Sequence, residues 1–408
     1  MEPKRTPTMT VDERYRLITR RQTLFQPFTS EDSIKRLLAK KLHPTVAWVT
    51  APTGKPHIGY FVPLTKMVDF LRAGLQPIIL YVDIYALLVN YVHPMALVKR
   101  RLSYYRHLTT AVLSSLGISP EQITHIDESS YAYTEAFIQE FHKLIVMMRR
   151  TDAHCTSEVA ETEMLSPLLC CIHQTLGEVF TGMDIQYGGL DQYDLFTHSA
   201  TFLPLINHQP REHIMNNMVP SLKYTSPSPS SSPSSSIPSS PTSSSKMSSS
   251  HSADAKIEFL DNPATVHQKV SEADCNPGDI THNNGVLGIL REIIWPIAEL
   301  HLERSRGAIG YNLLEGMDAK TEQVSFVFSS APEGSILSVC DLITGEERHY
   351  GLYDELERDY ADGFISPDDL KNTVIGALNQ LLRQIRKIYR ENEQWRVVDE
   401  LAYPGGVY

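Results

Sequence analysis

The sequence has few cysteines and no apolar run long enough to cross a membrane. Its 408 residues include five cysteines without a CxxC pair, and two of them, Cys170 and Cys171, are neighbours that cannot easily bridge each other. This pattern argues against a disulfide framework and favours a reducing compartment. The most lipid-like stretch, residues 77–92, is interrupted by Asp83. We therefore expect a soluble, cytoplasmic protein.

The sequence also lacks an excess of positive charge and the cysteine pairs of a zinc site. The formal net charge is −11, which argues against indiscriminate nucleic-acid binding but allows one basic face that docks a folded RNA. His208 and His213 have a spacing that zinc could use, but no cysteine pair accompanies them. We expect no structural metal site. With 42% hydrophobic residues, the chain can bury a sizeable core in two or three domains.

Alternating strand and helix patterns predict a parallel sheet in the first half of the chain. A helical pattern covers residues 11–21, and Ser30 opens a second helix. Buried strands are expected at residues 45–50 and 77–85, with a helix between them that ends at Gly74. Strand, helix, strand in this order implies a right-handed crossover and a parallel sheet. Later segments are a helix at 94–116, a strand at 123–127, mixed helices to about Phe180, and a strand, glycine turn and helix within 183–194.

A low-complexity tract separates this region from a mostly helical one. Residues 225–245 contain only Ser, Pro, Thr and one Ile, so they cannot pack a core and are expected to be disordered. The last strong helix should run from Leu370 to about Glu393. Its apolar stripe comprises Val374, Ile375, Leu378, Leu381, Leu382, Ile385 and Ile388, and the basic residues Arg383, Arg386, Lys387 and Arg390 lie elsewhere on it. A solvated surface explains this basic face better than RNA contact.

Two short segments have features of a phosphate site. TAPTGKPHIGY leads from the first strand into its helix and places His57 at a helix N-terminus, where N–H groups and the helix dipole favour phosphate. Gly59 would let a flat base approach the backbone. KMSSS begins at Lys246 and follows a serine-rich tract, so only Lys246 and Met247 require coincidence and each segment alone is weak evidence. The two segments lie at the first crossover and near the end of the same domain, and these positions strengthen the interpretation of each as part of a phosphate site.

Four longer segments contain these motifs in a definite order. They are TAPTGKPHIGYFVP, YGGLDQYDLF, NNMVPSLK followed by SSSKMSSS, and ISPDDLKNTV. Together they resemble the eukaryotic and archaeal branch of the tyrosyl-tRNA synthetases, which are class I aminoacyl-tRNA synthetases. Four matches in family order make coincidence negligible.

The resemblance implies an α/β protein of two domains. An N-terminal helical segment (1–43) precedes a Rossmann-type, parallel-sheet catalytic domain (44–260), and an α-helical anticodon-binding domain (261–408) follows. The tract at 225–245 is then an insertion before the KMSSS loop. The resemblance also implies a homodimer that binds ATP, with Mg²⁺ as the nucleotide's counter-ion, an amino acid and a tRNA. Asp369 is the implied tRNA contact.

The resemblance further assigns the site residues. In this family a histidine and a mobile-loop lysine hold the triphosphate from two sides while the amino-acid carboxylate attacks the α-phosphate, so catalysis is mostly positioning and charge stabilisation. His57 and Lys246 would be these catalytic residues. The implied ATP site comprises Thr53, Gly54, His57, Gly59, Gly189, Asp191, Lys246, Met247 and Ser248, with Asp191 on the ribose hydroxyls. The implied amino-acid pocket comprises Ala47, Tyr85, Cys170, Gln174, Gly177 and Gln192.

The pocket departs from the family pattern at four positions. The family has tyrosines at the positions of Ala47 and Cys170, an aspartate at that of Gly177 and a histidine at that of Tyr85. The aspartate accepts the hydrogen bond of the substrate's phenol. Its loss should remove on the order of 4 to 7 kcal/mol of discrimination between tyrosine and phenylalanine.

A second departure follows Gln192. The family has a basic pair there that faces the tRNA acceptor stem, and this chain has Tyr193 and Asp194, a change that is unfavourable near a phosphate backbone. Three functions remain open: a tyrosine–tRNA ligase, an adenylate-forming enzyme for another amino acid, or a non-catalytic paralogue that binds nucleotide or a protein partner. ATP–pyrophosphate exchange across a panel of amino acids separates them.

Overall fold

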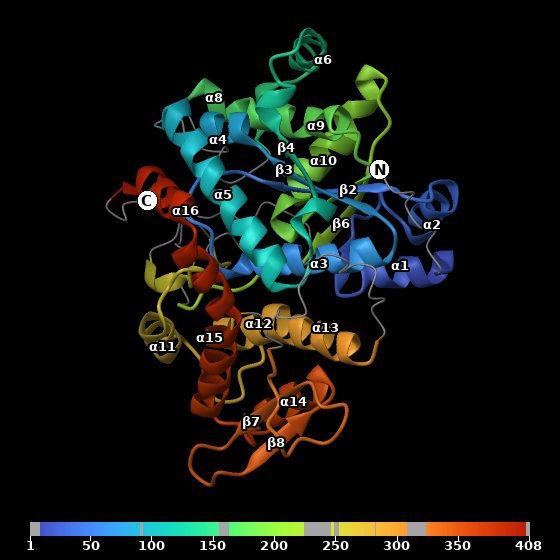
Figure 1. Ribbon diagram of the computed structural model, residues 1–408. Coiled ribbons are helices and arrows are strands. Elements are labelled where there is room, and N and C mark those ends of the chain that lie inside the picture. Colours follow the sequence, from blue (N-terminus) through green and yellow to red (C-terminus); the bar gives the residue numbers. More distant parts are fainter. Residues whose placement is uncertain are drawn as a thin grey trace.

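The chain forms a sheet-based region followed by a mostly helical one, which lies below the sheet in Figure 1. The structure is a computed structural model that describes residues 9–89, 93–154, 163–223, 246–248, 253–281, 283–307 and 324–404. The serine- and proline-rich tract, expected to be disordered, lies outside these ranges. None of the described helices has the length and apolarity needed to cross a membrane.

The first region is built on a six-stranded sheet. Its strands are β1 (Gln22–Leu24), β2 (Thr45–Thr50), β3 (Gln76–Tyr81), β4 (Thr124–Asp127), β5 (Ile185–Gly189) and β6 (Glu212–Asn216). They lie in the order β1-β6-β5-β2-β3-β4. All neighbours are parallel except β1, which pairs antiparallel with β6 at the edge. The parallel sheet expected from the sequence is therefore confirmed.

Helices cover both faces of this sheet. They are α1 (Val11–Thr19), α2 (Glu31–Lys40), α3 (Phe61–Arg72), α4 (Asp83–Val89), α5 (Met95–Ser115), α6 (Glu135–Ile145), α8 (Leu165–Leu168), α9 (Cys170–Phe180) and α10 (Tyr193–Phe202). Helix α2 begins where the sequence predicts because the Ser30 hydroxyl caps it by accepting a hydrogen bond from the Ser33 amide. Helix α3 ends before Gly74, which has a φ of 77°, a left-handed conformation that glycine adopts without strain.

One predicted strand is too long. The sequence pattern extends the second strand over residues 77–85, but β3 ends at Tyr81 and α4 begins at Asp83. Asp83 is buried, and its carboxylate accepts a hydrogen bond from the Ser129 amide. Continuous apolar sequence cannot distinguish a buried strand from a buried helix, which explains the error.

The side chains of β2 alternate between two cores. Val46 and Trp48 belong to a core with α3 and α5, whereas Ala47 points to a second core with α4, α6 and α9. This alternation matters for the site because Ala47 and Tyr85, which were expected to contact an amino acid, belong to or pack against the second core.

The second region contains one feature that was not expected. Its helices are α11 (Pro263–Ser271), α12 (Gly285–Ile289), a π-helical turn (Leu290–Ile294), α13 (Trp295–Ser305), α14 (Tyr353–Ala361), α15 (Pro367–Glu391) and α16 (Glu393–Ala402). The long helix α15 confirms the last predicted helix. An antiparallel hairpin of β7 (Leu337–Cys340) and β8 (Glu347–Tyr350) adds to the predicted helices.

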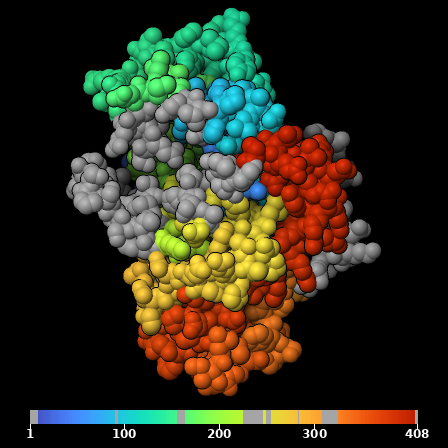
Figure 2. Space-filling model, turned by 90° about the vertical axis from the view of Figure 1, so that its left-hand side faces the viewer, coloured from blue at the N-terminus to red at the C-terminus, as the bar shows by residue number. Residues whose placement is uncertain are grey.

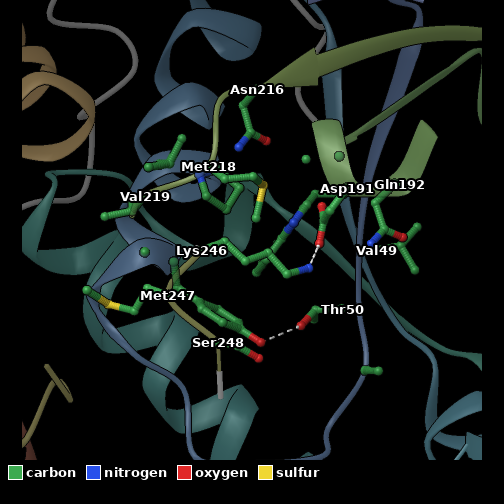
Figure 3. Close-up of a pocket in the computed structure, with 18 of the residues that line it drawn as sticks. Val49, Thr50, Asp191, Gln192, Asn216, Met218, Val219, Lys246, Met247 and Ser248 are labelled. Carbon is green, nitrogen blue, oxygen red and sulfur yellow. Dashed lines mark hydrogen bonds and ion pairs between the residues drawn. The ribbon is translucent and has the colours of Figure 1, made fainter. Parts of the chain in front are cut away.

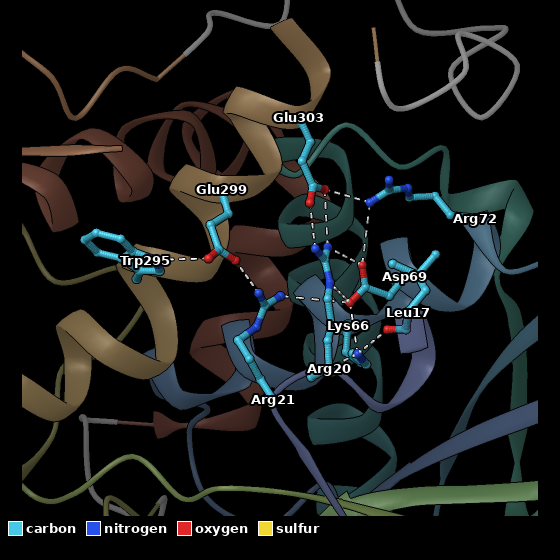
Figure 4. A network of polar contacts seen from close by, with 9 residues as sticks. All are labelled: Leu17, Arg20, Arg21, Lys66, Asp69, Arg72, Trp295, Glu299 and Glu303. Carbon is cyan, nitrogen blue, oxygen red and sulfur yellow. Dashed lines mark hydrogen bonds and ion pairs between the residues drawn. The ribbon is translucent and has the colours of Figure 1, made fainter. Parts of the chain in front are cut away.

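A network of charged groups joins the two regions around the buried carboxylate of Asp69 on α3 (Figure 4). Asp69 contacts Lys66 at 2.9 Å and Arg20 at 2.5 Å. Arg20 also contacts Glu303 of α13 at 2.6 Å. Burial lowers the pKa of Lys66 to about 8, although Asp69 acts to raise it. The helical region is therefore attached to the sheet region by charge pairing as well as by apolar packing.

The C-terminal helices complete this attachment. In the side view of Figure 2, the red C-terminal segment lies beside the cyan α5 and the yellow α11. Trp395 of α16 is fully buried, and its ring lies 5.9 Å from that of Tyr104 of α5. This packing brings α16 next to the loop that follows β2.

Candidate nucleotide and amino-acid site

A cavity of about 270 Å³ lies at the carboxyl ends of β2, β5 and β6 (Figure 3). The chain leaves β2 toward β3 on one side, and β5 lies on the other side, so the cavity is at a switch point of the sheet, where α/β proteins bind ligands. Of the predicted ATP-site residues, those that line it are Thr53, His57, Gly59, Gly189, Asp191, Lys246, Met247 and Ser248. Segments that are far apart in the sequence thus meet at one site.

The imidazole of His57 is oriented by its own turn. Its Nδ1 accepts the Gly59 amide hydrogen at 3.1 Å at the start of a 3₁₀ turn (Ile58–Tyr60). A neutral ring with this contact carries its proton on Nε2, which is then a hydrogen-bond donor. Gly59 is required here, since a Cβ at this position would lie 2.6 Å from the imidazole. This close approach gives a physical reason for the HIG sequence.

Gly54 supports the same loop from outside the cavity. It is the one predicted ATP-site residue that does not line the cavity. Its carbonyl oxygen accepts hydrogen bonds from the hydroxyls of Tyr105 at 2.7 Å and Tyr403 at 3.0 Å. The next residue, Lys55, forms an ion pair with Asp399 of α16 at 3.0 Å. The loop that carries His57 is therefore held by α5 and by the C-terminal end of the described chain.

Lys246 and Asp191 form an ion pair across the cavity (Figure 3). The lysine is placed by its neighbour, because the Met247 amide donates to the Val219 carbonyl at 2.7 Å and the Met247 side chain is buried. Asp191 lies in the 3₁₀ turn (Leu190–Gln192) after β5. A carboxylate and an ammonium group that face one cavity can bind the hydroxyl and phosphate parts of a nucleotide.

Only some of the residues expected to form the amino-acid pocket line the cavity. Tyr85, Gln174 and Gln192 line it, together with the apolar residues Val49, Ala51, Val82 and Val89. Glu128 supports this wall: its carboxylate accepts from the Tyr85 amide at 2.8 Å and contacts the His173 ring at 2.7 Å.

Three predicted pocket residues do not line the cavity. Ala47, Cys170 and Gly177 are absent from its wall, and Ala47 and Cys170 are at most 1% exposed. Ala47 points into the second core, and the position of a Cβ at Gly177 lies 3.5 Å from Leu80. The small side chains are therefore part of packed structure behind the cavity, and the cavity itself does not extend to them.

Asp369, the expected tRNA contact, has a structural role. Its side chain is buried, forms a capping box with Ser366 at the start of α15, and accepts from the Leu342 amide at 2.9 Å. The contact with tRNA stays a prediction. In the described part of the chain, no cluster of three or more His, Cys, Asp or Glu side chains could hold a metal ion.

Several lining residues were not predicted. Thr50, Tyr60, Asn216, Asn217, Met218 and Val219 also line the cavity. Asn216 ends β6 and residues 217–219 follow it directly, at the same edge of the sheet as Asp191. The rule that ligands bind at the carboxyl ends of parallel strands could have identified it from the NNMV sequence.

The family model described as tRNA synthetases class I (W and Y) matches residues 40–383. This chain belongs to that family. It is 33% identical over 396 residues to a cytoplasmic tyrosine–tRNA ligase of Gallus gallus, covering 96% of this chain and 63% of that protein. It is 30% identical to a cytoplasmic tyrosine–tRNA ligase of Saccharomyces cerevisiae, covering 97% and 89%. The chain thus spans about 63% of the length of the chicken relative.

Solved structures of tyrosyl-tRNA synthetases share the fold. The enzyme of Archaeoglobus fulgidus with L-tyrosine has a TM-score of 0.71 and 22% identity, covering 93% of this chain and 99% of that one. The enzyme of Pyrococcus horikoshii with L-tyrosine has a TM-score of 0.74 and 16% identity, covering 96% and 99%. The Rossmann-type domain and the helical region after it are therefore features of the family.

Proposed function

We propose that this chain activates L-tyrosine with ATP and transfers it to tRNA, as a tyrosine–tRNA ligase. The observation that carries the proposal is the meeting of His57, Asp191 and Lys246 at one cavity of a class I synthetase fold. The names of the relatives, tyrosine–tRNA ligases of the cytoplasm, support both the reaction and its place in the cell.

The reaction needs positioning more than proton transfer. A carboxylate oxygen of the amino acid attacks the α-phosphorus, the bond from that phosphorus to the bridging oxygen breaks, and pyrophosphate leaves with the electron pair. The Nε2–H group of His57 and the ammonium of Lys246 would stabilise the phosphate charge, and Asp191 would accept from the ribose hydroxyls. Gln174 and Gln192 would hold the amino acid's polar end. Lys246 must leave Asp191 to reach the phosphates.

The partners follow from this chemistry. Mg²⁺ would enter with the triphosphate as its counter-ion, because this ion is usually bound through substrate phosphates. The tRNA would receive the aminoacyl group at the same cavity. Tyr193 and Asp194, which begin α10 beside this site, should weaken contact with the acceptor stem relative to a basic pair. A homodimer is the expected assembly.

ATP–pyrophosphate exchange across a panel of amino acids tests the proposal. Exchange that depends on tyrosine, together with charging of a tRNA, is the expected result. Exchange with a different amino acid would replace tyrosine as the substrate but keep the reaction. No exchange with any amino acid would refute the proposal and favour a nucleotide- or protein-binding paralogue. His57→Ala should abolish exchange, and His267→Ala, at an exposed position on α11, is the matched control.

A further inference from the structure

Glu128 and His173 form a buried hydrogen-bonded pair behind one wall of the cavity. Glu128 begins the 3₁₀ turn (Glu128–Ser130) after β4 and is fully buried, and His173 of α9 is 8% exposed. The His173 Nδ1 atom lies 2.7 Å from one carboxylate oxygen of Glu128. An ionised carboxylate only accepts hydrogen bonds, so the imidazole carries a proton on Nδ1 and donates through it. Such a pair is weak evidence for added stability, because the loss of solvation offsets much of the attraction.

The pair links two walls of the cavity. The other carboxylate oxygen of Glu128 accepts the amide hydrogen of Tyr85 in α4 at 2.8 Å. The carbonyl oxygen of Tyr85 accepts a weak hydrogen bond from the thiol of Cys170 in α9 at 3.9 Å. One residue of α4 is thus attached to α9 twice, once directly and once through the pair. Tyr85 lines the cavity from α4, and Gln174, next to His173, lines it from α9.

The ring of His173 is also held by aromatic packing. Its centroid lies 5.2 Å from that of Phe137 and 5.5 Å from that of Phe141, both on α6. Phe137 is fully buried. A side chain in a close-packed interior has few alternative positions, so the imidazole is kept in contact with Glu128. Neither member of the pair lines the cavity in the described structure, so contact with a bound molecule does not explain the pair.

We propose that Glu128 and His173 are positioning residues that hold the Tyr85 wall at the distance from Gln174 that the bound amino acid requires. The inference rests on the proposed function and deepens it. Catalysis by positioning depends on accurate placement, and a displacement of about 1 Å can lower the rate roughly 100-fold. Loss of the pair should therefore impair use of the amino acid. Use of ATP should change little, because the predicted ATP-site residues lie on other segments.

Substitutions of His173 that move the hydrogen-bond donor test the proposal. His173→Asn places an amide N–H at the position of Nδ1, His173→Gln places it near that of Nε2, and His173→Leu removes it. Pyrophosphate exchange gives KM for tyrosine and KM for ATP. His173→Leu and His173→Gln should raise KM for tyrosine about tenfold and leave KM for ATP within about twofold. His173→Asn should keep both values, since it retains the donor that Glu128 needs.

A second buried pair on α9 supplies the matched control. Glu178 of α9 and His213 of β6 are fully buried, with 2.9 Å between a carboxylate oxygen and Nε2, and neither lines the cavity in the described structure. His213→Leu should lower the melting temperature but leave both KM values unchanged. KM does not depend on the fraction of protein that is folded, so a purely structural role of His173 would give the same result as His213→Leu.

The outcomes separate this inference from the proposed function. An unchanged KM for tyrosine in His173→Leu, or in His173→Gln if the leucine variant does not fold, overturns the inference and leaves the proposed function intact. It is also overturned if His173→Asn raises KM as much as His173→Leu, or if KM for ATP rises equally. If the unmodified protein uses another amino acid, KM for that amino acid decides. If it activates none, the proposed function and the inference fail together.

Discussion

Replacing Lys246 by alanine should change the binding of adenosine and of ATP in opposite directions. In the free protein the Lys246 ammonium is paired with the Asp191 carboxylate, and the two side chains are 21% and 22% exposed. The proposed function gives these groups different parts of ATP, the phosphates to Lys246 and the ribose hydroxyls to Asp191. Adenosine must therefore compete with Lys246 for the carboxylate, whereas ATP offers the lysine a new partner.

The size of each effect follows from the exposure of the pair. An ion pair that is partly exposed contributes about 1 kcal/mol after solvent screening. Its removal should tighten adenosine binding roughly fivefold, since a factor of ten corresponds to about 1.4 kcal/mol. For ATP, the same change also removes a charge-assisted contact of about 2 kcal/mol. The net loss of about 1 kcal/mol should weaken ATP binding roughly fivefold.

Isothermal titration calorimetry of adenosine and ATP measures both effects. Lys223→Ala is the control, because Lys223 is a partly buried lysine of a neighbouring segment that does not line the cavity. The decisive quantity is the affinity for adenosine in Lys246→Ala. If it is unchanged or weaker than in the unmodified protein, Lys246 does not compete with the nucleoside for Asp191 and the reasoning is wrong.

Three further predictions concern the site and the fold. Gly189→Ala should lower ATP affinity with little loss of stability, because a Cβ there would lie 2.5 Å from the sulfur of Met218 and also press on Asp191; calorimetry and thermal melting check this. Burial lowers the pKa of His125 from 6.5 to about 4, so the unfolded chain binds more protons between these values, and stability should fall as pH falls from 6.5 to 4. His125→Asn should remove this slope in urea unfolding, and His267→Asn should keep it. Asp69→Asn should lower the free energy of unfolding by about 3 kcal/mol, measured in urea, because it leaves the buried Lys66 without its charged partner.

Much of the fold was predictable because its signals are local. Strand β2 has the predicted bounds, since six apolar and β-branched residues lie between turn signals. Ser30 and Ser366 mark the starts of α2 and α15 by capping bonds within three residues. The hairpin of β7 and β8 escaped prediction because its short strands lie among helices and show no strong alternation. The same limit applied after β3, where apolar sequence continues into a helix.

The meeting of most predicted ATP-site residues at one cavity was predictable for the same reason. His57 is oriented by Gly59 two residues away, and Lys246 is placed by the backbone contact of Met247 with Val219. Each motif thus contains most of what fixes its geometry. Gly54 is the exception, since it does not line the cavity and its carbonyl accepts from hydroxyls distant in the sequence.

The amino-acid end was harder to predict because it is part of the core of the protein. Whether Ala47 or Gly177 reaches a cavity depends on how the neighbouring side chains fill the interior, and no local pattern states this. A close-packed interior has few voids, so when a side chain is lost at one position, the neighbouring side chains fill the space. Tyr131 and Leu80 are those neighbours at Gly177. Under the proposed function, changes on this face of α9 should therefore alter which amino acid is accepted, whereas ATP binding should depend on His57, Asp191 and Lys246 in other segments.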